Sequence, residues 1–200
     1  MIETVPVALG TRSYDVKLAA GLLSEAGAHI APLLKRPKVA IVSDAHVASL
    51  HLETLTKSLD AQGISHSNLS LPQGESTKSW AHLQDVVHWL LSEQIERADV
   101  VIAFGGGVIG DLVGFAASVL RRGVRFVQIP TSLLAQVDSS VGGKTGINAP
   151  HGKNLIGAFH QPSLVLADIS VLGTLTERDF LAGYGEVAKY GLLGDAAFFD

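Results

Sequence analysis

The feature that most constrains this chain is an apolar run that breaks into three glycines and then meets an acid. Residues 100–104 carry no polar side chain, which is typical of a central parallel strand covered on both faces. Residues 105–107 are all glycine, so the backbone can turn tightly and approach a ligand where a Cβ would collide. The segment predicts a buried strand that delivers a phosphate-binding turn. The alternative is a glycine turn that only joins a strand to a packed helix.

This turn differs from the usual dinucleotide-binding fingerprint. Gly105, Gly107 and Gly110 fit the pattern G-x-G-x-x-G. The usual fingerprint has an acid about 20 residues further on that holds the ribose, whereas residues 127–132 contain no acid. A bound ribose would therefore be held differently. Because a carboxylate would repel a phosphate, we expect Asp111 to face a ribose, a nicotinamide amide or a water.

Composition sets the class of protein. The 200 residues are 47% hydrophobic and 17% charged, which suits one α/β domain, or one domain and the beginning of another. A net charge of −4 with scattered basic residues argues against a nucleic-acid surface, and the absence of cysteine excludes disulfides and thiolate metal sites. No apolar run approaches the roughly 18 residues that a membrane span needs, and no secretory signal is evident at Met1. We expect a cytoplasmic protein that contacts neither membrane nor nucleic acid.

Strand-like and helix-like segments alternate along the chain. Expected strands are a hairpin at 4–9 and 13–18, then 39–43, 66–71, 100–104, 125–129 and 164–168; expected helices are 22–33, 47–62, 80–93 and 112–120. This alternation predicts an α/β, Rossmann-like, mostly parallel sheet with flanking helices. Residues 142–157 read as an irregular loop or small hairpin. Helical periodicity at 176–193 predicts the start of a separate helical domain, which gives a division into residues 1–173 and 174–200.

Polar residues follow several predicted strands at the edge where open α/β sheets bind ligands. They are Asp44, Asp111, Thr131 and Ser132. Thr131 and Ser132 can also cap the following helix, and capping explains them equally well.

The sequence Gly143-Lys144-Thr145 invites a P-loop interpretation, but Asp138 stands where the first glycine belongs and residues 133–137 look helical. We therefore reject it. Lys144, Lys153 and Asn154 still form a cationic, hydrogen-bonding set suited to a carboxylate or a phosphate. The alternative is a solvated loop with ordinary surface lysines.

Glu186 and Lys189 are three residues apart, so a helix places them on one face. Gly183, Gly185 and Gly191 lie in the same segment, and because glycine weakens a helix we expect close packing or a ligand there. Glu186 is a candidate ligand for a divalent metal, although one carboxylate is not a metal site. The alternative is a surface ion pair.

Five segments together carry a resemblance to a known family. They are GGGVIGD at 105–111, RRGV at 121–124, QIPTSLLAQVDSSVGGKT at 128–145, GKNLIGAF at 152–159 and GEVAKYG at 185–191. In this order and spacing, the chain resembles the 3-dehydroquinate synthase family over residues 39–200. The resemblance implies NAD used catalytically, a divalent metal (zinc or cobalt), a homodimer, and a phosphorylated keto-acid sugar, 3-deoxy-D-arabino-heptulosonate 7-phosphate, as substrate.

The resemblance also assigns roles to residues. Those around NAD are Asp44, Gln73, Gly74, Glu75, Ser76, Thr77, Lys78, Gly107, Val108, Ile109, Gly110, Asp111, Thr131, Ser132, Lys144, Lys153, Val171, Leu172, Gly173 and Thr174. Catalytic or substrate-facing residues are Asp138, Lys144, Asn154, Lys189 and Arg122, the last reaching the phosphate in the neighbouring subunit, and Glu186 is the metal ligand. Gln73, Ser132 and Gly173 depart from residues frequent in the family, and Gly173 puts one contact with the cofactor in doubt.

The family continues into a helical domain that supplies two histidine metal ligands, and this chain does not include it. We therefore expect the chain alone to bind NAD weakly or not at all and to be inactive. Three other readings remain open: a sister sugar-phosphate cyclase, a metal-dependent polyol or alcohol dehydrogenase, and a non-catalytic nucleotide-binding or oligomerisation domain.

Overall fold

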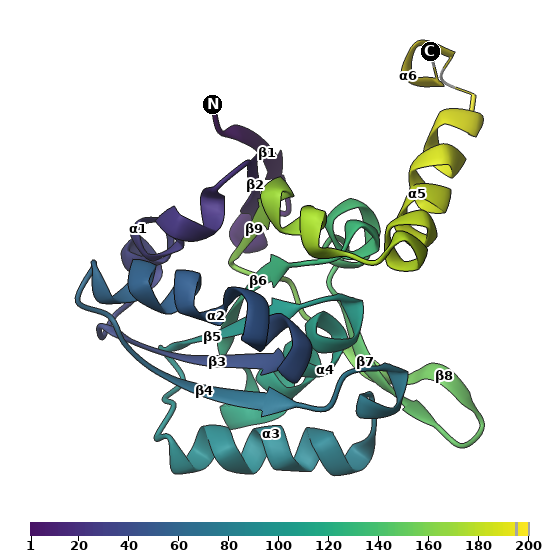
Figure 1. The fold of residues 1–200 in the computed structure, drawn as a ribbon. Helices are drawn as coiled ribbons and strands as arrows, with labels where there is room; N and C mark the ends of the chain where they lie inside the picture. Colours follow the sequence, from purple (N-terminus) through teal and green to yellow (C-terminus); the bar gives the residue numbers. More distant parts are fainter. Residues whose placement is uncertain (195, 200) are drawn as a thin grey trace.

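The computed structural model describes residues 1–194 and 196–199. A seven-stranded sheet, ordered β1-β2-β9-β6-β5-β3-β4, forms the centre, and a two-stranded ribbon, β7-β8, projects beside it (Figure 1). The strands are β1 (Glu3–Val7), β2 (Tyr14–Ala19), β3 (Lys38–Asp44), β4 (Ser65–Leu71), β5 (Val100–Gly105), β6 (Arg125–Pro130), β7 (Lys144–Ala149), β8 (Gly152–Phe159) and β9 (Leu164–Asp168).

Helices join and cover these strands. They are α1 (Ala26–Ile30), α2 (Ala45–Asp60), α3 (Trp80–Ser92), α4 (Gly107–Val119), α5 (Glu177–Leu192) and α6 (Ala196–Phe199). The helix expected at 22–33 is broken, because 3₁₀ turns precede and follow the short α1. Pro32 lies in the second of these turns, where its ring suits the start of a turn but not the interior of an α-helix.

The pairing confirms the Rossmann-like α/β fold. β1 and β2 pair antiparallel as the expected hairpin, and the other neighbours in the main sheet are parallel. The segment at 142–157 is a hairpin rather than an irregular loop, with β7 and β8 antiparallel and an irregular register between Ile147 and Ala149.

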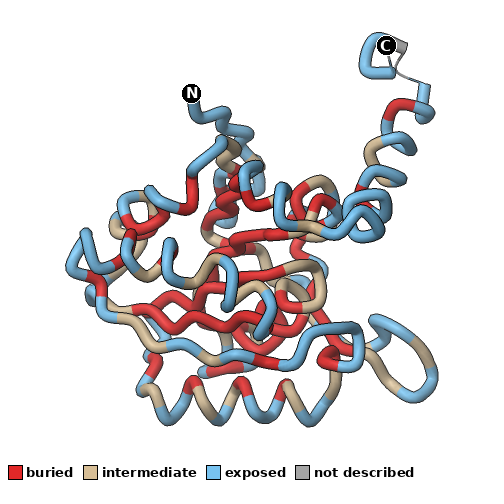
Figure 2. Tube along the Cα trace, viewed as in Figure 1, coloured by how far each residue is buried: buried red, intermediate tan, exposed pale blue. Residues whose placement is uncertain are grey.

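The apolar central strands serve two cores, one on each face of the sheet. On β3, Val39 and Ile41 join the core under α1 and α2, whereas Ala40 and Val42 join the core under α3 and α4. This follows from the alternation of side chains along a strand. Figure 2 shows the result as a buried centre beneath exposed helical surfaces. A strand buried on both faces has no polar positions, which is why residues 100–104 read as one apolar run.

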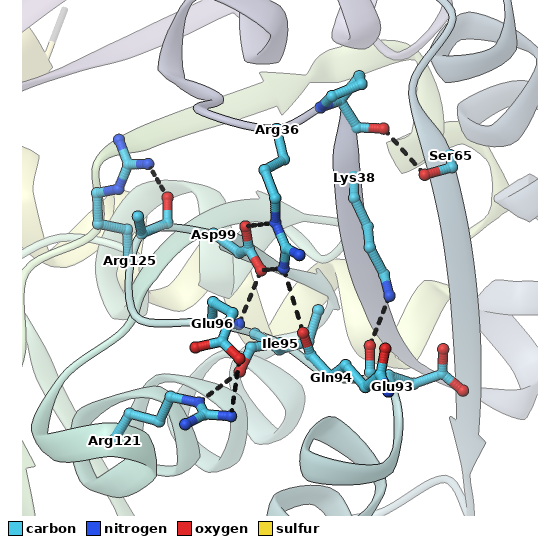
Figure 3. Close-up of polar contacts among 12 residues, drawn as sticks. Arg36, Lys38, Ser65, Glu93, Gln94, Ile95, Glu96, Asp99, Arg121 and Arg125 are labelled. Atoms are coloured by element: carbon cyan, nitrogen blue, oxygen red, sulfur yellow. Dashed lines mark hydrogen bonds and ion pairs between the residues drawn. The ribbon is translucent and has the colours of Figure 1, made fainter.

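The edge where β3, β5 and β6 begin, here called the amino edge, is closed by hydrogen bonds to charged side chains (Figure 3). The Asp99 side chain is 1% exposed. It accepts from Arg36 Nε over 3.0 Å and from the Glu96 backbone N–H over 2.7 Å. Burial alone would raise the pKa of Asp99, but the Arg36 guanidinium and the Glu96 amide outweigh it and hold that pKa below its usual range.

Cations also cap the backbone carbonyls between α3 and β5. The donor and acceptor pairs are Lys38 to Glu93, Arg36 to Gln94, Arg121 to Ile95 and Arg125 to Ala98. These carbonyls belong to the segment that connects α3 to β5, and the cations supply hydrogen-bond partners to them. We call these cations, Asp99 and the carbonyls that they contact the amino-edge clamp. The sequence did not predict it, because its members come from four separate segments.

α5 leads away from the sheet and exposes much of its surface (Figures 1 and 2). Phe180, Leu181 and Tyr184 are each more than 40% exposed. The expected helix at 176–193 is thus present, with Thr176 as its N-cap. Among the described residues, no helix has both the length and the apolar character that crossing a membrane requires.

Candidate functional site

The glycine turn joins β5 to α4 at the opposite, carboxyl edge of the sheet. Gly105 ends β5, Gly106 is the N-cap, and Gly107 begins α4. A Cβ on Gly105 would lie 2.8 Å from the side chain of Ile109, and one on Gly107 would lie 2.9 Å from Ser139 Oγ. The helix begins at residue 107 rather than at the expected 112. Its first-turn N–H groups therefore face the carboxyl edge, where a helix N-terminus favours an anion.

A cleft of about 260 Å³, here called the first cleft, opens at this turn. It lies among the carboxyl ends of β3 to β6 and the beginning of α5. Its lining includes Asp44, His46, Val47, Leu50, His51, Pro72, Gln73, Gly74, Gly106, Gly107, Val108, Ile109, Thr131, Ser132, Leu134, Thr174, Leu175, Thr176, Asp179 and Ala182. Nine of these residues belong to the expected NAD set, and Gly106 is a further glycine of the turn, so the structure brings about half of that set around one space.

Asp44 places an acid beside the glycine turn. It ends β3, whose Ser43 pairs with Phe104 of β5, so its carboxylate lies level with the turn. Its Oδ1 accepts from the N–H groups of His46 and Val47, which caps α2. The acid thus precedes the turn in sequence but lies beside it in space.

Two histidines in the first cleft were missed by the sequence analysis. His46 and His51 belong to α2, and His51 Nε2 lies 2.9 Å from Thr174 Oγ1. Burial lowers the pKa of His51. Their positions at the start of a helix that follows a strand were the available signal.

A second cleft of about 480 Å³ adjoins α4 and the β7–β8 hairpin. Its lining is Asp111, Asp138, Ser139, Val141, Lys144, Thr145, Gly146, Asn154, Leu155, Gly157, Ala158 and Phe159. Asp138, Lys144 and Asn154, expected to face substrate, therefore share one space. Lys144 is exposed, and its ammonium has no hydrogen-bond or ion-pair partner in the part of the chain that the structure describes.

Lys78 links this cleft to the glycine-turn helix. Its side chain is 4% exposed, and its ammonium donates to Asp111 Oδ2 over 2.6 Å and to Asn154 Oδ1. Burial raises the pKa of Asp111, while the hydrogen bond and charge of Lys78 oppose that rise, and the Glu75 and Asp138 charges add to it. The nearest partner of Asp111 is thus a lysine of this chain, which the sequence reasoning about a ribose, an amide or a water did not include.

The residues from Gln73 to Lys78 differ in burial and in whether they line the first cleft. Gln73 and Gly74 line the first cleft, and Glu75 and Ser76 are exposed. Thr77 is buried, and its hydroxyl donates to the Pro72 carbonyl over 2.6 Å, so it shapes the turn.

Some residues of the expected NAD set lie outside both linings. Lys153 is 74% exposed, with its Nζ 3.9 Å from Glu75 Oε1. Val171 packs in the core beneath α2, while Gly173 is exposed. A Cβ on Gly110 would lie 3.4 Å from Gln128 Oε1, so this position of α4 is directed toward β6.

α5 approaches the first cleft through a glycine. A Cβ on Gly183 would lie 2.5 Å from the Leu134 backbone nitrogen and 2.6 Å from Leu133 Cβ. This confirms the expectation of close packing at Gly183; Gly191 is also buried, with a Cβ there 3.2 Å from Phe199, whereas Gly185 has open space. The contact sets the position of α5 relative to residues that line the cleft.

Glu186 and Lys189 form an ion pair on α5. The hydrogen bond to Glu186 raises the pKa of Lys189, and the charge of Asp138 contributes to that rise. Among residues 1–194 and 196–199, no group of three or more His, Cys, Asp or Glu side chains is arranged to hold a metal ion. These residues alone therefore do not form a metal centre.

Arg122 lies apart from the other candidate residues, because it lines neither cleft. It follows α4 at the amino edge, is exposed, and has φ 62°, a left-handed conformation. The structure brings it to neither cleft.

Comparison with known proteins assigns the chain to a family. Residues 68–182 match the model of the 3-dehydroquinate synthase N-terminal family. The chain belongs to the 3-dehydroquinate synthase family. A relative from Jannaschia sp. (strain CCS1), named 3-dehydroquinate synthase, is 72% identical over the whole chain, and so is one from Ruegeria pomeroyi. The chain spans about half the length of the curated relatives it matches, 54% in both cases.

Two solved structures share the fold. A 2-epi-5-epi-valiolone synthase from Streptomyces hygroscopicus subsp. jinggangensis, solved with NAD⁺ and Zn²⁺, is 36% identical with a TM-score of 0.85. That alignment covers 96% of this chain and 52% of the other. An iron-containing alcohol dehydrogenase, 18% identical with a TM-score of 0.76, covers 90% of this chain and 52% of its own and shares the fold alone.

Proposed function

We propose that this chain is the cofactor-binding half of a 3-dehydroquinate synthase. The parent protein would convert 3-deoxy-D-arabino-heptulosonate 7-phosphate to 3-dehydroquinate and phosphate. The observation that carries the proposal is the meeting of two clefts at α4, one built around the glycine turn and Asp44, the other around Lys144 and Asn154. The 72% identity to proteins of that name supports it.

The first cleft is proposed to bind NAD. The N-terminus of α4 offers N–H groups to the pyrophosphate, and the Asp44 carboxylate offers an acceptor to a ribose hydroxyl. The Cβ distances at Gly105 and Gly107 fit this cradle, because larger residues would crowd the turn. Bound NAD would accept a hydride from the substrate and return it later in the same turnover.

The second cleft is proposed to hold the sugar phosphate. The ammonium of Lys144 has no hydrogen-bond or ion-pair partner among the described residues, so it can offer its charge to a phosphate or carboxylate. Asn154 and Asp138 offer polar contacts. Lys78 fixes Asp111 and Asn154 between the two clefts. Lys189 would approach the same substrate from α5, and Arg122 would reach its phosphate from the neighbouring subunit of a homodimer.

A divalent metal, zinc or cobalt, is part of the proposal, with Glu186 as one ligand. The carboxylate is a suitable oxygen donor, but it faces Lys189 and belongs to no metal-binding group among the described residues, so we propose that the remaining ligands come from outside them. We divide the parent at residue 173, with residues 174–200 beginning the domain that supplies them. Since NAD and sugar phosphates are cytoplasmic metabolites, we place the reaction in the cytoplasm.

The test uses the full-length parent protein with NAD, zinc and the keto-acid sugar phosphate. Release of inorganic phosphate without accumulation of NADH is expected, because the hydride returns to the substrate. Stoichiometric NADH would instead indicate a dehydrogenase. Phosphate release only from a sugar phosphate without a carboxylate would indicate a sister cyclase, the alternative favoured by the likeness to a 2-epi-5-epi-valiolone synthase. Either result overturns the proposal.

The chain alone has a separate test. A calorimetric titration with NAD is expected to show weak binding or none, because α5 exposes apolar side chains beside the first cleft and the described residues hold no complete set of metal ligands. Turnover by this chain with added zinc would contradict that expectation.

A further inference from the structure

Asn148 closes a ring of hydrogen bonds with the two side chains that meet at the second cleft. Its backbone N–H donates to the Lys78 carbonyl over 2.9 Å, and its Oδ1 accepts from the Asn154 backbone N–H over 2.9 Å. The ring is completed because Asn154 Oδ1 accepts from the Lys78 ammonium. Asn148 itself lines neither cleft.

The ring holds Asn154 in a backbone conformation that needs support. Asn154 has φ 58°, in the left-handed region, which costs free energy even for asparagine. The β7–β8 register is irregular here, since it passes from Ile147 opposite Ile156 to Ala149 opposite Gly152. The Asn148 side chain therefore supplies the acceptor for the Asn154 N–H where the regular ladder is interrupted.

A further contact fixes the orientation of the Asn148 carboxamide. Its Nδ2 donates to Glu75 Oε1 over 2.8 Å, so its nitrogen faces Glu75 and its oxygen faces Asn154. Glu75 begins the short 3₁₀ turn that follows Gln73 and Gly74, which line the first cleft. Asn148 thus ties the segment beside the first cleft to the hairpin beside the second.

We propose that Asn148 is a positioning residue, which holds Asn154 and Lys78 in the orientation that the reaction uses. This inference rests on the proposed function. Asn148 would not contact substrate or cofactor. It would act by fixing the left-handed backbone of Asn154 and the carbonyl of Lys78, and small displacements of groups at a reaction centre cost large factors in rate.

The first experiment compares two variants of the hairpin in the full-length parent protein. Asn148→Ala is expected to lower kcat/KM for the sugar phosphate about 10-fold or more at saturating NAD. Ile147→Ala is the matched control, because Ile147 neighbours Asn148 in β7, is fully buried in the core and lines neither cleft. If both variants lose activity equally, relative to their thermal midpoints, Asn148 only stabilises the hairpin and the proposal fails.

The second experiment exchanges donor and acceptor along the Asn148–Glu75 hydrogen bond. Asn148→Asp keeps an acceptor for the Asn154 N–H but places two carboxylates in contact, so kcat/KM is expected to fall. Adding Glu75→Gln restores a donor opposite an acceptor with the same net charge, and is expected to recover at least half of the loss on a logarithmic scale. This pair keeps the side-chain sizes, so it serves even where Asn148→Ala does not fold.

Absence of recovery in the double variant would overturn the positioning role, because a role through this hydrogen bond requires rescue. The unsubstituted parent distinguishes this outcome from failure of the proposed function. If that parent releases no phosphate from the keto-acid sugar phosphate, the proposed function is wrong. If it does, the ratios among variants test Asn148 alone.

Discussion

The two edges of the same parallel sheet differ in what their polar groups do. At the amino edge, Arg36, Arg121 and Asp99 have partners within the chain, and carbonyls after α3 are capped. At the carboxyl edge, the first turn of α4 lines a cleft. The ammonium of Lys144 has no hydrogen-bond or ion-pair partner among the described residues. Groups satisfied internally stabilise the fold, whereas groups left available can bind a ligand. Stability and binding are therefore assigned to opposite ends of the same strands.

The largest expected difference between the edges concerns two lysines. Lys78→Met at the carboxyl edge removes the cation between Asp111 and Asn154, and kcat/KM of the parent protein is expected to fall about 100-fold. Lys38→Met at the amino edge removes a donor to the Glu93 carbonyl and is the matched control. Steady-state kinetics on folded samples decide the matter. A comparable loss in both variants would break the distinction between the edges.

At the amino edge, Asp99→Asn is expected to lower the free energy of unfolding by about 2 kcal/mol, because a buried charged acceptor of several N–H groups is replaced. Asp85→Asn, on an exposed part of α3, is the control and should change little. Denaturant unfolding of the parent protein measures both. The comparison predicts that kcat/KM of Asp99→Asn stays close to that of the parent, and a selective loss of activity would contradict it.

The edges should also respond to acid with opposite sign. The pKa of Asp99 is lowered on folding, so its stabilising contribution is present above the unfolded value of about 3.9 and is lost as pH falls further. The pKa of Asp111 is raised, so its contribution favours the folded state at low pH and is lost as pH rises through the raised value. Asp99→Asn should therefore flatten the decline in stability as pH falls below about 4. Thermal midpoints across that range test this, and an unchanged slope would contradict the assignment.

The smallest expected effect comes from Ser132, which belongs to the carboxyl edge but also caps local backbone. Ser132 Oγ accepts from the Ala135 N–H over 3.3 Å. Ser132→Ala should cost about 0.5–1 kcal/mol of stability and weaken NAD binding by the parent protein. Calorimetry and thermal unfolding separate the two. An unchanged affinity would show that Ser132 is only a cap.

Much of the fold was predictable because its signals are local. Alternation of strand-like and helix-like segments, the buried run before Gly105, and the capping residue Asp44 each depend on a few neighbouring residues. The start of α4 was misplaced by five residues because glycine disfavours helix, whereas the helix here is fixed by close contacts with Ile109 and Ser139. Tertiary packing therefore outweighed the low helix propensity of these glycines.

The site was less predictable from the residues themselves. The role of Asp44 opposite the glycine turn depends on β3 lying next to β5, which a spacing rule along the chain does not contain. The resemblance supplied Lys78 and Asn154, but the ring through Asn148 needs the irregular register of the hairpin. The amino-edge clamp has no motif, because Arg36 and Asp99 meet only after the sheet has formed.

The strand order has a consequence for how the chain becomes folded during synthesis. β2 pairs with β1 and with β9. Val16 therefore cannot pair with Val165 until β9 has been synthesised. Asp168, at the end of β9, then accepts from the backbone N–H groups of Gly21 and Leu23. The block of β3, β4, β5 and β6 needs no such distant partner and can assemble first, since local contacts cost less loop-closure entropy. β1 and β2 are synthesised before the other strands of this sheet and are thus among the last to join it.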